Sequence, residues 1–266
     1  MKLKKLSNNL RFSIIKMSQE TKSPHLASSL SCIDIIATLY DSILKINKAN
    51  INSNLRDRFI LSKGHAAAAL YVALEYKNII SKKELKSYTK FGSLLEEHPS
   101  PKLSGVEAAT GSLGHGLSIG CGIALSSKLI KKKFMTYVLM SDGECNEGSV
   151  WEAALFASAK KLSNLCAFVD YNKWQATGKS KEILKLGSLA NKFNEFGWNV
   201  LEIDGHNHYS ISNACKKAIR ESSKPTIVIA NTTKGKGVSF MEDDNNWHYR
   251  IPSNEEVKLA KKELNI

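Results

Sequence analysis

The sequence predicts an α/β fold, with a doubly wound, mainly parallel sheet and helices on both faces. Short apolar runs typical of strands alternate with helical patterns, which is the pattern of βαβ units. The 266 residues are 42% hydrophobic, enough for one large core. No repeat, low-complexity tract or Pro/Gly-rich linker divides the chain, so we expect one domain over residues 1–266.

The first part of the chain is expected to be helical. Apolar residues recur at helical spacing at Leu3, Leu6, Leu10 and Ile14. Ser31 and Asp34 have the spacing of a capping box and predict a helix that starts there. Ser253 and Glu256 have the same spacing and predict a terminal helix that reaches Leu264.

Five short apolar runs are predicted to form the strands of the sheet. They are "RFILS" (58–62), "MTYVLM" (135–140), "LCAFVDY" (165–171), "WNVLEID" (198–204) and "PTIVIANT" (225–232). Helical segments separate them, which favours a parallel sheet that is covered on both sides.

The net charge of +13 favours an anionic partner, either nucleic acid or a phosphorylated small molecule. The densest cluster, "KLIKKKF" at 128–134, lies between an apolar helix and a strand, where a solvated helix end explains it. The sequence has no zinc-finger, RNA-recognition or arginine-rich motif. We therefore expect no nucleic-acid partner.

Cysteine usage and hydropathy predict a cytoplasmic protein with no membrane partner. The five cysteines are scattered without metal spacing, which favours reduced thiols. Asn8, Asn9 and Arg11 interrupt any signal-peptide core near the N-terminus. The longest apolar run, 66–74, is too short to span a membrane.

Polar residues follow two of the predicted strands, where ligands bind in an open parallel sheet. Asp142 and Gly143 come directly after one strand, and Asn172 follows the next. Carboxylate and amide oxygens suit Mg²⁺, which completes its shell with phosphate oxygens and water. A helix that starts near Gly148 would turn its free amides toward such an anion. The same spacing is also compatible with a plain helix cap at Asp142 and a plain turn at Asn172.

This segment resembles the thiamine-diphosphate signature, an Asp-Gly followed about thirty residues later by an Asn at a strand end. Its flanks resemble the transketolase family. Three further stretches resemble transketolase blocks in the expected order: "DRFILSKGHAAAALY" (57–71), "HPSPKLSGVEAATGSLGHGLSIGCGIA" (98–124) and "TTKGKGVSFMEDDNNWH" (232–248). Two departures are Ser141, where the signature usually has Gly, and Tyr171, where Asn or Asp is common.

The resemblance implies a site for thiamine diphosphate and Mg²⁺, or another divalent cation such as Ca²⁺ or Mn²⁺. It implies that the metal is bound by Asp142, Asn172 and the backbone carbonyl of Trp174. The residues that it places around the cofactor are His65, Gly111, Ser112, Leu113, His115, Gly143, Glu147, Asn172 and Trp174. His115 stands where many relatives carry Gln, and Glu147 matches an acid that helps to join the two halves of the active site.

The resemblance also implies which residues take part in catalysis: His25, His65, His98, His248 and Glu147. Two-carbon transfer between sugars needs proton removal and delivery near neutral pH, where imidazole titrates. Taken singly, each histidine has a simpler interpretation: His65 can be a turn residue, and His98 can lie in a surface loop.

A full-length transketolase continues with a pyrimidine-binding domain and a C-terminal domain. The resemblance therefore implies that this chain is the N-terminal, diphosphate-binding subunit of a split transketolase. Its partner would be a C-terminal subunit, with two copies of each chain in a heterotetramer. The substrates would be sugars or sugar phosphates of the pentose phosphate pathway or of specialised sugar metabolism.

Three other functions remain open from the sequence. A deoxyxylulose phosphate synthase-like protein shares the fold and cofactor, although "CNEGSVWEA" resembles transketolase more closely. A dinucleotide-binding dehydrogenase needs G-x-G-x-x-G after a strand, and "GSLGHG" at 111–116 follows no convincing strand. A basic nucleic-acid-binding or scaffold protein would explain the charge but not the ordered motifs.

Overall fold

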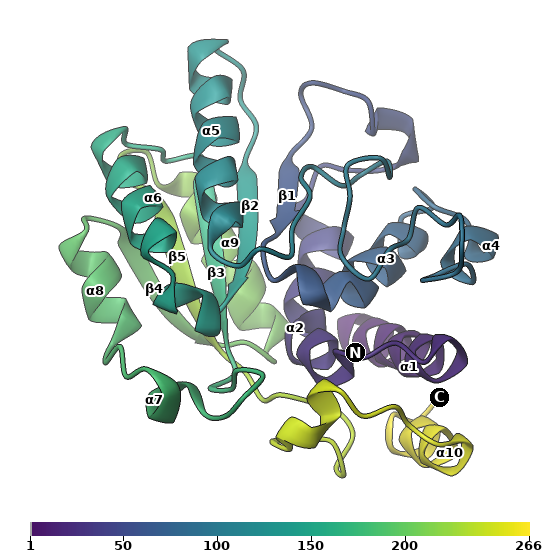
Figure 1. The fold of residues 1–266 in the computed structure, drawn as a ribbon. Helices are drawn as coiled ribbons and strands as arrows, with labels where there is room; N and C mark the ends of the chain where they lie inside the picture. Colours follow the sequence, from purple (N-terminus) through teal and green to yellow (C-terminus); the bar gives the residue numbers. More distant parts are fainter. Residues whose placement is uncertain (1) are drawn as a thin grey trace.

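The computed structural model describes residues 2–266, which form a parallel sheet with helices on both sides (Figure 1). The strands are β1 (Arg58–Leu61), β2 (Thr136–Ser141), β3 (Leu165–Tyr171), β4 (Asn199–Asp204) and β5 (Thr226–Asn231). Their order in the sheet is β1-β2-β3-β5-β4, and each neighbouring pair is parallel. The predicted fold class is confirmed, and each strand begins and ends within one residue of its predicted bounds.

Helices cover both faces of this sheet, and shorter or peripheral ones lie around its edges (Figure 1). They are α1 (Lys2–Thr21), α2 (Leu26–Thr38), α3 (Ala67–Tyr76), α4 (Lys82–Leu85), α5 (His115–Leu129), α6 (Gly148–Ala159), α7 (Ser180–Ile183), α8 (Leu189–Glu195), α9 (His208–Arg220) and α10 (Asn254–Glu263). One face of the sheet packs against α2, α3 and α9, with α1 outside them, and the other face packs against α5, α6 and α8.

The side chains of each strand alternate between two apolar cores. On β2, Tyr137 and Leu139 belong to the core beneath α2 and α9, whereas Val138 and Met140 belong to the core beneath α5 and α6. Because both faces are covered, residues 137–140 of the strand form a continuous apolar run that does not alternate with polar residues. Each fully buried side chain of this size contributes about 1.5–3 kcal/mol.

The apolar character of α2 follows from its central place in the fold. Among residues 2–266, the stretch Leu26–Ile43 has the length and mean hydropathy, 1.3, of a membrane span, and 83% of it is buried inside the protein. Such a core helix needs no membrane to account for its composition.

One of the two predicted capping boxes is confirmed and the other is wrong. Ser253 Oγ accepts a hydrogen bond from the Glu256 amide at 3.2 Å, and the Glu256 side chain accepts one from the Ser253 amide at 2.8 Å, at the start of α10. Ser31 and Asp34 lie inside α2, which begins earlier. Their side chains bind partners distant in the sequence, such as Arg11 for Asp34, so tertiary contacts rather than capping explain them.

Two further predictions are confirmed by the packing. Helix α5 ends at Leu129, and the lysine-rich residues 128–133, which lie in and just after its last turn, are exposed. Among the described residues the five cysteines are free, and all are buried in the two cores.

Candidate active site

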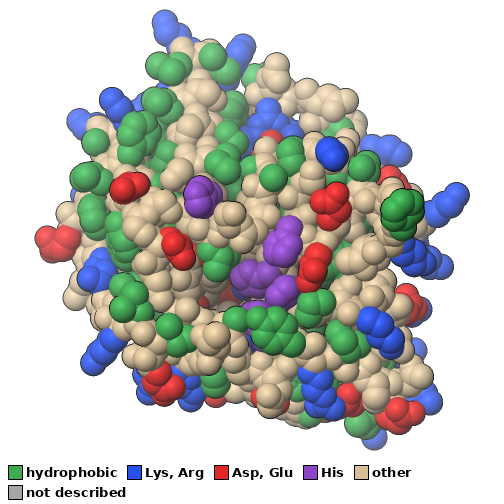
Figure 2. Space-filling view, in the orientation of Figure 1, with side chains coloured by type: hydrophobic (Ala, Val, Ile, Leu, Met, Phe, Trp, Pro, Cys, Tyr) green, Lys and Arg blue, Asp and Glu red, His purple; other side chains and the backbone are tan. Residues whose placement is uncertain are grey.

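A cavity of about 330 Å³ opens at the carboxyl ends of β2 and β3. Figure 2 shows histidine side chains gathered in a hollow on this side of the molecule. Ten of the predicted site residues line the cavity: His25, His65, His98, Gly111, Leu113, Gly143, Glu147, Asn172, Trp174 and His248. The structure therefore brings together residues from six separate parts of the chain.

Four histidine rings face one another across this cavity. The ring centroids of His25 and His248 are 5.0 Å apart, those of His25 and His65 are 5.6 Å apart, and those of His25 and His98 are 6.2 Å apart. His25 precedes α2 with a left-handed φ of 65°, and its backbone amide donates to the His248 carbonyl at 2.6 Å. That hydrogen bond joins the start of α2 to the C-terminal part of the chain.

Burial keeps two of these imidazoles neutral. Burial and the nearby Lys63 hold the pKa of His65 well below its ordinary value. Burial and Lys234 lower the pKa of His248 to about 3. At neutral pH both rings are thus neutral groups that can donate and accept hydrogen bonds. A bound anion would counteract the effect of the two lysines.

The residue environment at the end of β2 fits a divalent cation. Asp142 Oδ2 accepts a hydrogen bond from Ser180 Oγ at 2.7 Å, while its Oδ1 is buried without a hydrogen-bond partner among residues 2–266. Burial raises the pKa of this carboxyl to about 6. A buried carboxylate oxygen without a partner is unfavourable, and a cation would satisfy it.

Asn172 reaches the same edge of the sheet from the neighbouring strand, as predicted. Ser141 pairs with Asp170 in the sheet register, so the residues that follow β2 and β3 emerge together. Asn172 Oδ1 accepts a hydrogen bond from the Trp174 amide at 3.0 Å, which fixes the turn carrying the Trp174 carbonyl. Asp142 is the one carboxylate of the predicted ligand set. Within residues 2–266, no cluster of three or more His, Cys, Asp or Glu side chains offers an alternative metal site.

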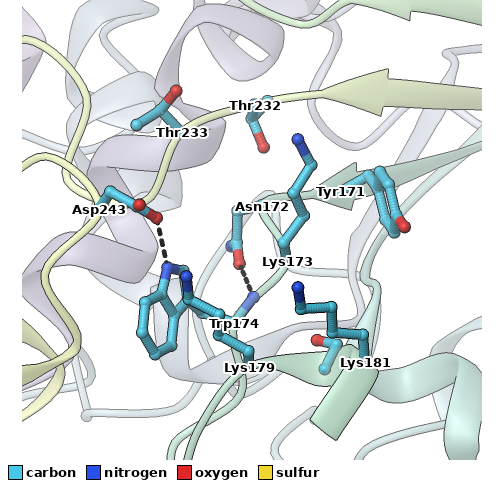
Figure 3. Close-up of a pocket in the computed structure, with 10 residues that line it drawn as sticks. Tyr171, Asn172, Lys173, Trp174, Lys179, Lys181, Thr232, Thr233 and Asp243 are labelled. Carbon is cyan, nitrogen blue, oxygen red and sulfur yellow. Dashed lines mark hydrogen bonds between the residues drawn. The ribbon is translucent and has the colours of Figure 1, made fainter. Parts of the chain in front are cut away.

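Trp174 also borders a second hollow of about 380 Å³, which Figure 3 shows. Its indole Nε1 donates to Asp243 Oδ1 at 2.6 Å, and Lys179 Nζ lies 5.2 Å from the ring centroid. The turn after β3 is therefore held from both sides, by Asn172 and by Asp243.

A buried ion pair that the sequence reasoning missed lies directly beneath the site. Lys63 Nζ bonds to Asp170 Oδ2, and both side chains are fully buried. Asp170 also accepts hydrogen bonds from Ser31 Oγ at 2.6 Å, Thr232 Oγ1 at 2.5 Å and Asn172 Nδ2 at 3.2 Å. Burial disfavours the carboxylate, but Lys63 and these donors hold the pKa of Asp170 below its ordinary value. Asp170 thereby orients the Asn172 amide so that its oxygen can face a metal.

A second missed lysine, Lys234, stands behind the histidines. Its Nζ donates to Asn245 Oδ1 at 2.6 Å and lies 3.0 Å from His248 Nδ1. Burial and the Lys63 charge lower the pKa of Lys234 to about 8. Two features of the sequence could have indicated these lysines: Lys63 directly follows a predicted strand, and Lys234 lies in the "TTKGKG" block. Lysine is, however, usually a surface residue, so its sequence position alone does not predict burial.

Glu144 is a third missed residue, and it fixes the "GSLG" turn. One of its carboxylate oxygens accepts hydrogen bonds from Ser62 Oγ and from the Gly114 amide at 3.0 Å, and the other accepts one from the Ser141 amide at 2.9 Å. Gly114 has a φ of 85°, and a Cβ there would lie 2.6 Å from the Glu147 Cβ. Only glycine fits between this turn and Glu147.

Gly111 allows the same loop to approach a histidine closely. Its φ is 141°, and a Cβ there would lie 2.8 Å from His98 Cδ2. The loop that carries His98 thus packs directly against the cavity wall.

Two predicted cofactor contacts lie outside the cavity lining. Ser112 is exposed, and His115 is an exposed residue at the start of α5 whose Nδ1 lies 3.1 Å from the Leu113 carbonyl oxygen. Their contact with a cofactor stays a prediction.

The sequence of this chain matches a known protein family. Residues 3–266 match the family described as "Transketolase, thiamine diphosphate binding domain". An apulose-4-phosphate transketolase subunit of Phocaeicola vulgatus is 39% identical over 258 residues, which cover 97% of this chain and 92% of that protein. The 6-deoxy-6-sulfo-D-fructose transketolase subunit SqwG of Clostridium sp. is 40% identical over 241 residues, 90% of this chain and 88% of that protein.

Longer transketolases match over only part of their length. Transketolase of Homo sapiens is 37% identical over 95% of this chain, which covers 40% of the human protein. The crystal structure of transketolase from Campylobacter jejuni superposes with a TM-score of 0.93 at 30% identity, covering 100% of this chain and 43% of that one. The chain thus spans about two fifths of these longer proteins.

Proposed function

Because the chain belongs to the transketolase family as its thiamine-diphosphate-binding domain, we propose that it is the N-terminal subunit of a split transketolase. With a C-terminal partner subunit it would transfer a two-carbon ketol unit from a ketose donor to an aldose acceptor. It would do so in the cytoplasm with thiamine diphosphate and Mg²⁺, or with Ca²⁺ or Mn²⁺ in its place.

The observation that carries this proposal is the buried, unpartnered Asp142 oxygen beside a cavity lined by four histidines. Asp142, Asn172 and the Trp174 carbonyl would hold the cation, and Gly143 would face the diphosphate. Lys234 adds positive charge beneath it, whereas the charge of Lys63 is paired with Asp170. Gln175 Nε2, another buried donor with no partner in residues 2–266, lines the same cavity and is available to a phosphate oxygen.

When bound, the thiazolium ring of the cofactor supplies the electron sink for breaking a bond beside a ketose carbonyl. The protein's part is to position the sugar and move its protons. His25, His65, His98 and His248 face the same space, so a sugar there would meet imidazole nitrogens that donate and accept hydrogen bonds. For His65 and His248 to accept and return hydroxyl protons, the bound diphosphate would have to offset the lysine charges that lower their pKa. Glu147, at the start of α6 and in the cavity wall, would meet the partner's half of the site.

Two observations support the need for a second chain. The relatives that are named as transketolase subunits match nearly over their whole length, whereas the longer transketolases extend well beyond the matched region. The outer face of α6 leaves Leu155 and Phe156 exposed by 58% and 40%. An assembly of two copies of each chain would cover such a surface.

The relatives are compatible with substrate sugars from either of two kinds of metabolism. Two are named for apulose 4-phosphate and for 6-deoxy-6-sulfo-D-fructose, which favours a specialised sugar or sugar phosphate. The pentose phosphate pathway is the alternative, since the human relative is named only as a transketolase, without a sugar. A deoxyxylulose phosphate synthase-like reaction would instead yield a different product from pyruvate and an aldose, so product analysis separates the two.

The test is two-carbon transfer from a ketose donor, assayed with thiamine diphosphate and Mg²⁺, with and without a candidate C-terminal subunit. We expect no turnover by the chain alone and recovery with the partner, because the glutamate that activates the aminopyrimidine in this family belongs to another domain. Full activity of the chain alone would contradict the split-enzyme proposal.

A further inference from the structure

A second polar cluster lies further along α2 than the cavity, around the carboxylate of Asp34. The Asp34 side chain is only 5% exposed. Its Oδ2 accepts from Arg11 of α1 and from His206 Nδ1 at 2.8 Å, and its Oδ1 lies 3.6 Å from His208 Nε2. None of these four residues lines the cavity described above.

Two side chains of this cluster, Arg11 and His206, form hydrogen bonds with the backbone of the segment that follows β5. Arg11 Nε donates to the Lys236 carbonyl at 2.9 Å, and His206 Nε2 accepts from the Thr233 amide at 2.8 Å. The two contacts lie on either side of Lys234 in the sequence. Asp34 thus holds the backbone on both flanks of the lysine that bonds to Asn245 and lies beside His248.

The segment 233–236 is also tightly confined by its own backbone. Gly235 has a φ of 75°, and a Cβ there would lie 2.0 Å from the Met241 carbonyl oxygen. Its amide donates to the Ala27 carbonyl at 3.1 Å, in the first turn of α2 beside His25. A shift of this segment would therefore displace both Lys234, which lies beside His248, and the first turn of α2, which follows His25.

Asp34 sets the direction of the His206 hydrogen bonds. Because the carboxylate accepts at Nδ1, the imidazole proton sits there, and Nε2 is left as the acceptor that the Thr233 amide requires. Burial disfavours the Asp34 carboxylate, but His206 and Arg11 hold its pKa well below the ordinary value, so it stays charged. This is the arrangement by which carboxylates orient functional histidines elsewhere.

We propose that Asp34 and His206 are positioning residues that fix the segment 233–236 and thereby place Lys234 against His248. The part of this inference that concerns catalysis rests on the proposed function, whereas the part that concerns the segment does not. The chain supplies a matched control, since His208 approaches the same carboxylate and is similarly exposed, 17% against 15% for His206. His208 bonds to Thr38 and Ser7, on the helices α2 and α1, instead of to the segment.

The first experiment measures amide hydrogen exchange of the isolated chain for His206→Ala and His208→Ala. We expect the peptide that covers 233–236 to exchange about tenfold faster or more in His206→Ala only. Unchanged exchange there, or equal acceleration in both variants, would overturn the proposal. His206 is used because Asp34→Asn strips the buried Arg11 of its counter-ion and can prevent folding.

The second experiment is a double-mutant cycle with Lys234→Ala in the complete enzyme. Loss of a positioning contact to an active-site group typically costs about ten- to hundredfold in activity, and we expect His206→Ala to lower kcat by about tenfold. This loss should disappear in the Lys234→Ala background, while His208→Ala changes kcat little. Additive losses would show that His206 does not act through Lys234. If wild-type enzyme has no two-carbon transferase activity, the proposed function fails, and the exchange result still decides whether His206 holds the segment.

Discussion

Replacing Lys234 by methionine should change how the stability of the chain depends on pH. The side chain is 1% exposed, and burial together with Lys63 lowers its pKa from the ordinary 10.5 to about 8. At about 1.4 kcal/mol for each pH unit, this lowering corresponds to ~3 kcal/mol by which the buried charge destabilises the fold. Methionine fills a similar volume without the charge.

The pH window follows from the two pKa values. Below pH 8 the folded and unfolded chains both carry the proton, and only the folded chain has a buried charge. Between pH 8 and 10.5 the folded chain releases the proton while the unfolded chain keeps it, so the stability of the wild type rises relative to the variant. The hydrogen bonds to Asn245 and His248 that the variant loses add an offset, which largely cancels when two pH values are compared.

The assay is urea unfolding of the isolated chain at pH 7 and pH 10, for the wild type and Lys234→Met. The stability difference, variant minus wild type, should fall by about 2–3 kcal/mol between these pH values. Lys236→Met is the control, because Lys236 lies two residues away in a part-exposed ion pair with Glu242 and should show little change. A difference that stays constant within about 0.5 kcal/mol would refute the reasoning on the buried charge.

Three further predictions concern the metal site, a histidine and the packing of α5. Asp142→Ala should abolish Mg²⁺-dependent binding of thiamine diphosphate in titration calorimetry with the partner present, and wild-type affinity would exclude Asp142 as a ligand. His248→Ala should lower the turnover number with little change in cofactor affinity, whereas an unaltered steady-state rate would remove it from catalysis. Gly116→Ala should destabilise the chain by about 1–3 kcal/mol in urea unfolding, because its Cβ would lie 2.3 Å from Ser62 Oγ. Gly122→Ala on the same helix meets nothing within 4 Å and should instead stabilise it by about 0.5–1 kcal/mol, so equal effects of the two changes would contradict this interpretation of the packing.

The strands and the strand-end ligands could be predicted because their signals are local. The run 165–169 is continuous and apolar because both faces of β3 are buried, and a buried strand of this kind is visible in the sequence. Asp142 and Asn172 were found by the rule that parallel strands bring their carboxyl ends together. The gathering of the four histidines could be inferred only from the family resemblance.

The parts that sequence reasoning missed depend on pairs of residues far apart in the chain. Asp170 pairs with Lys63 across 107 positions, and nothing in either local pattern indicates the partner. Ser31 and Asp34 show the converse error. Their three-residue spacing matches a capping box, but a helix turn gives the same spacing to two residues that face different tertiary partners, Asp170 for Ser31 and Arg11 for Asp34.

The backbone hydrogen bond between His25 and His248 has a consequence for how the chain matures. The cavity is closed by two residues that lie 223 positions apart in the sequence, so it cannot form on a ribosome before His248 has emerged. Thiamine diphosphate therefore arrives too late to guide strand pairing. It can stabilise only a fold that already carries both histidines, by mass action.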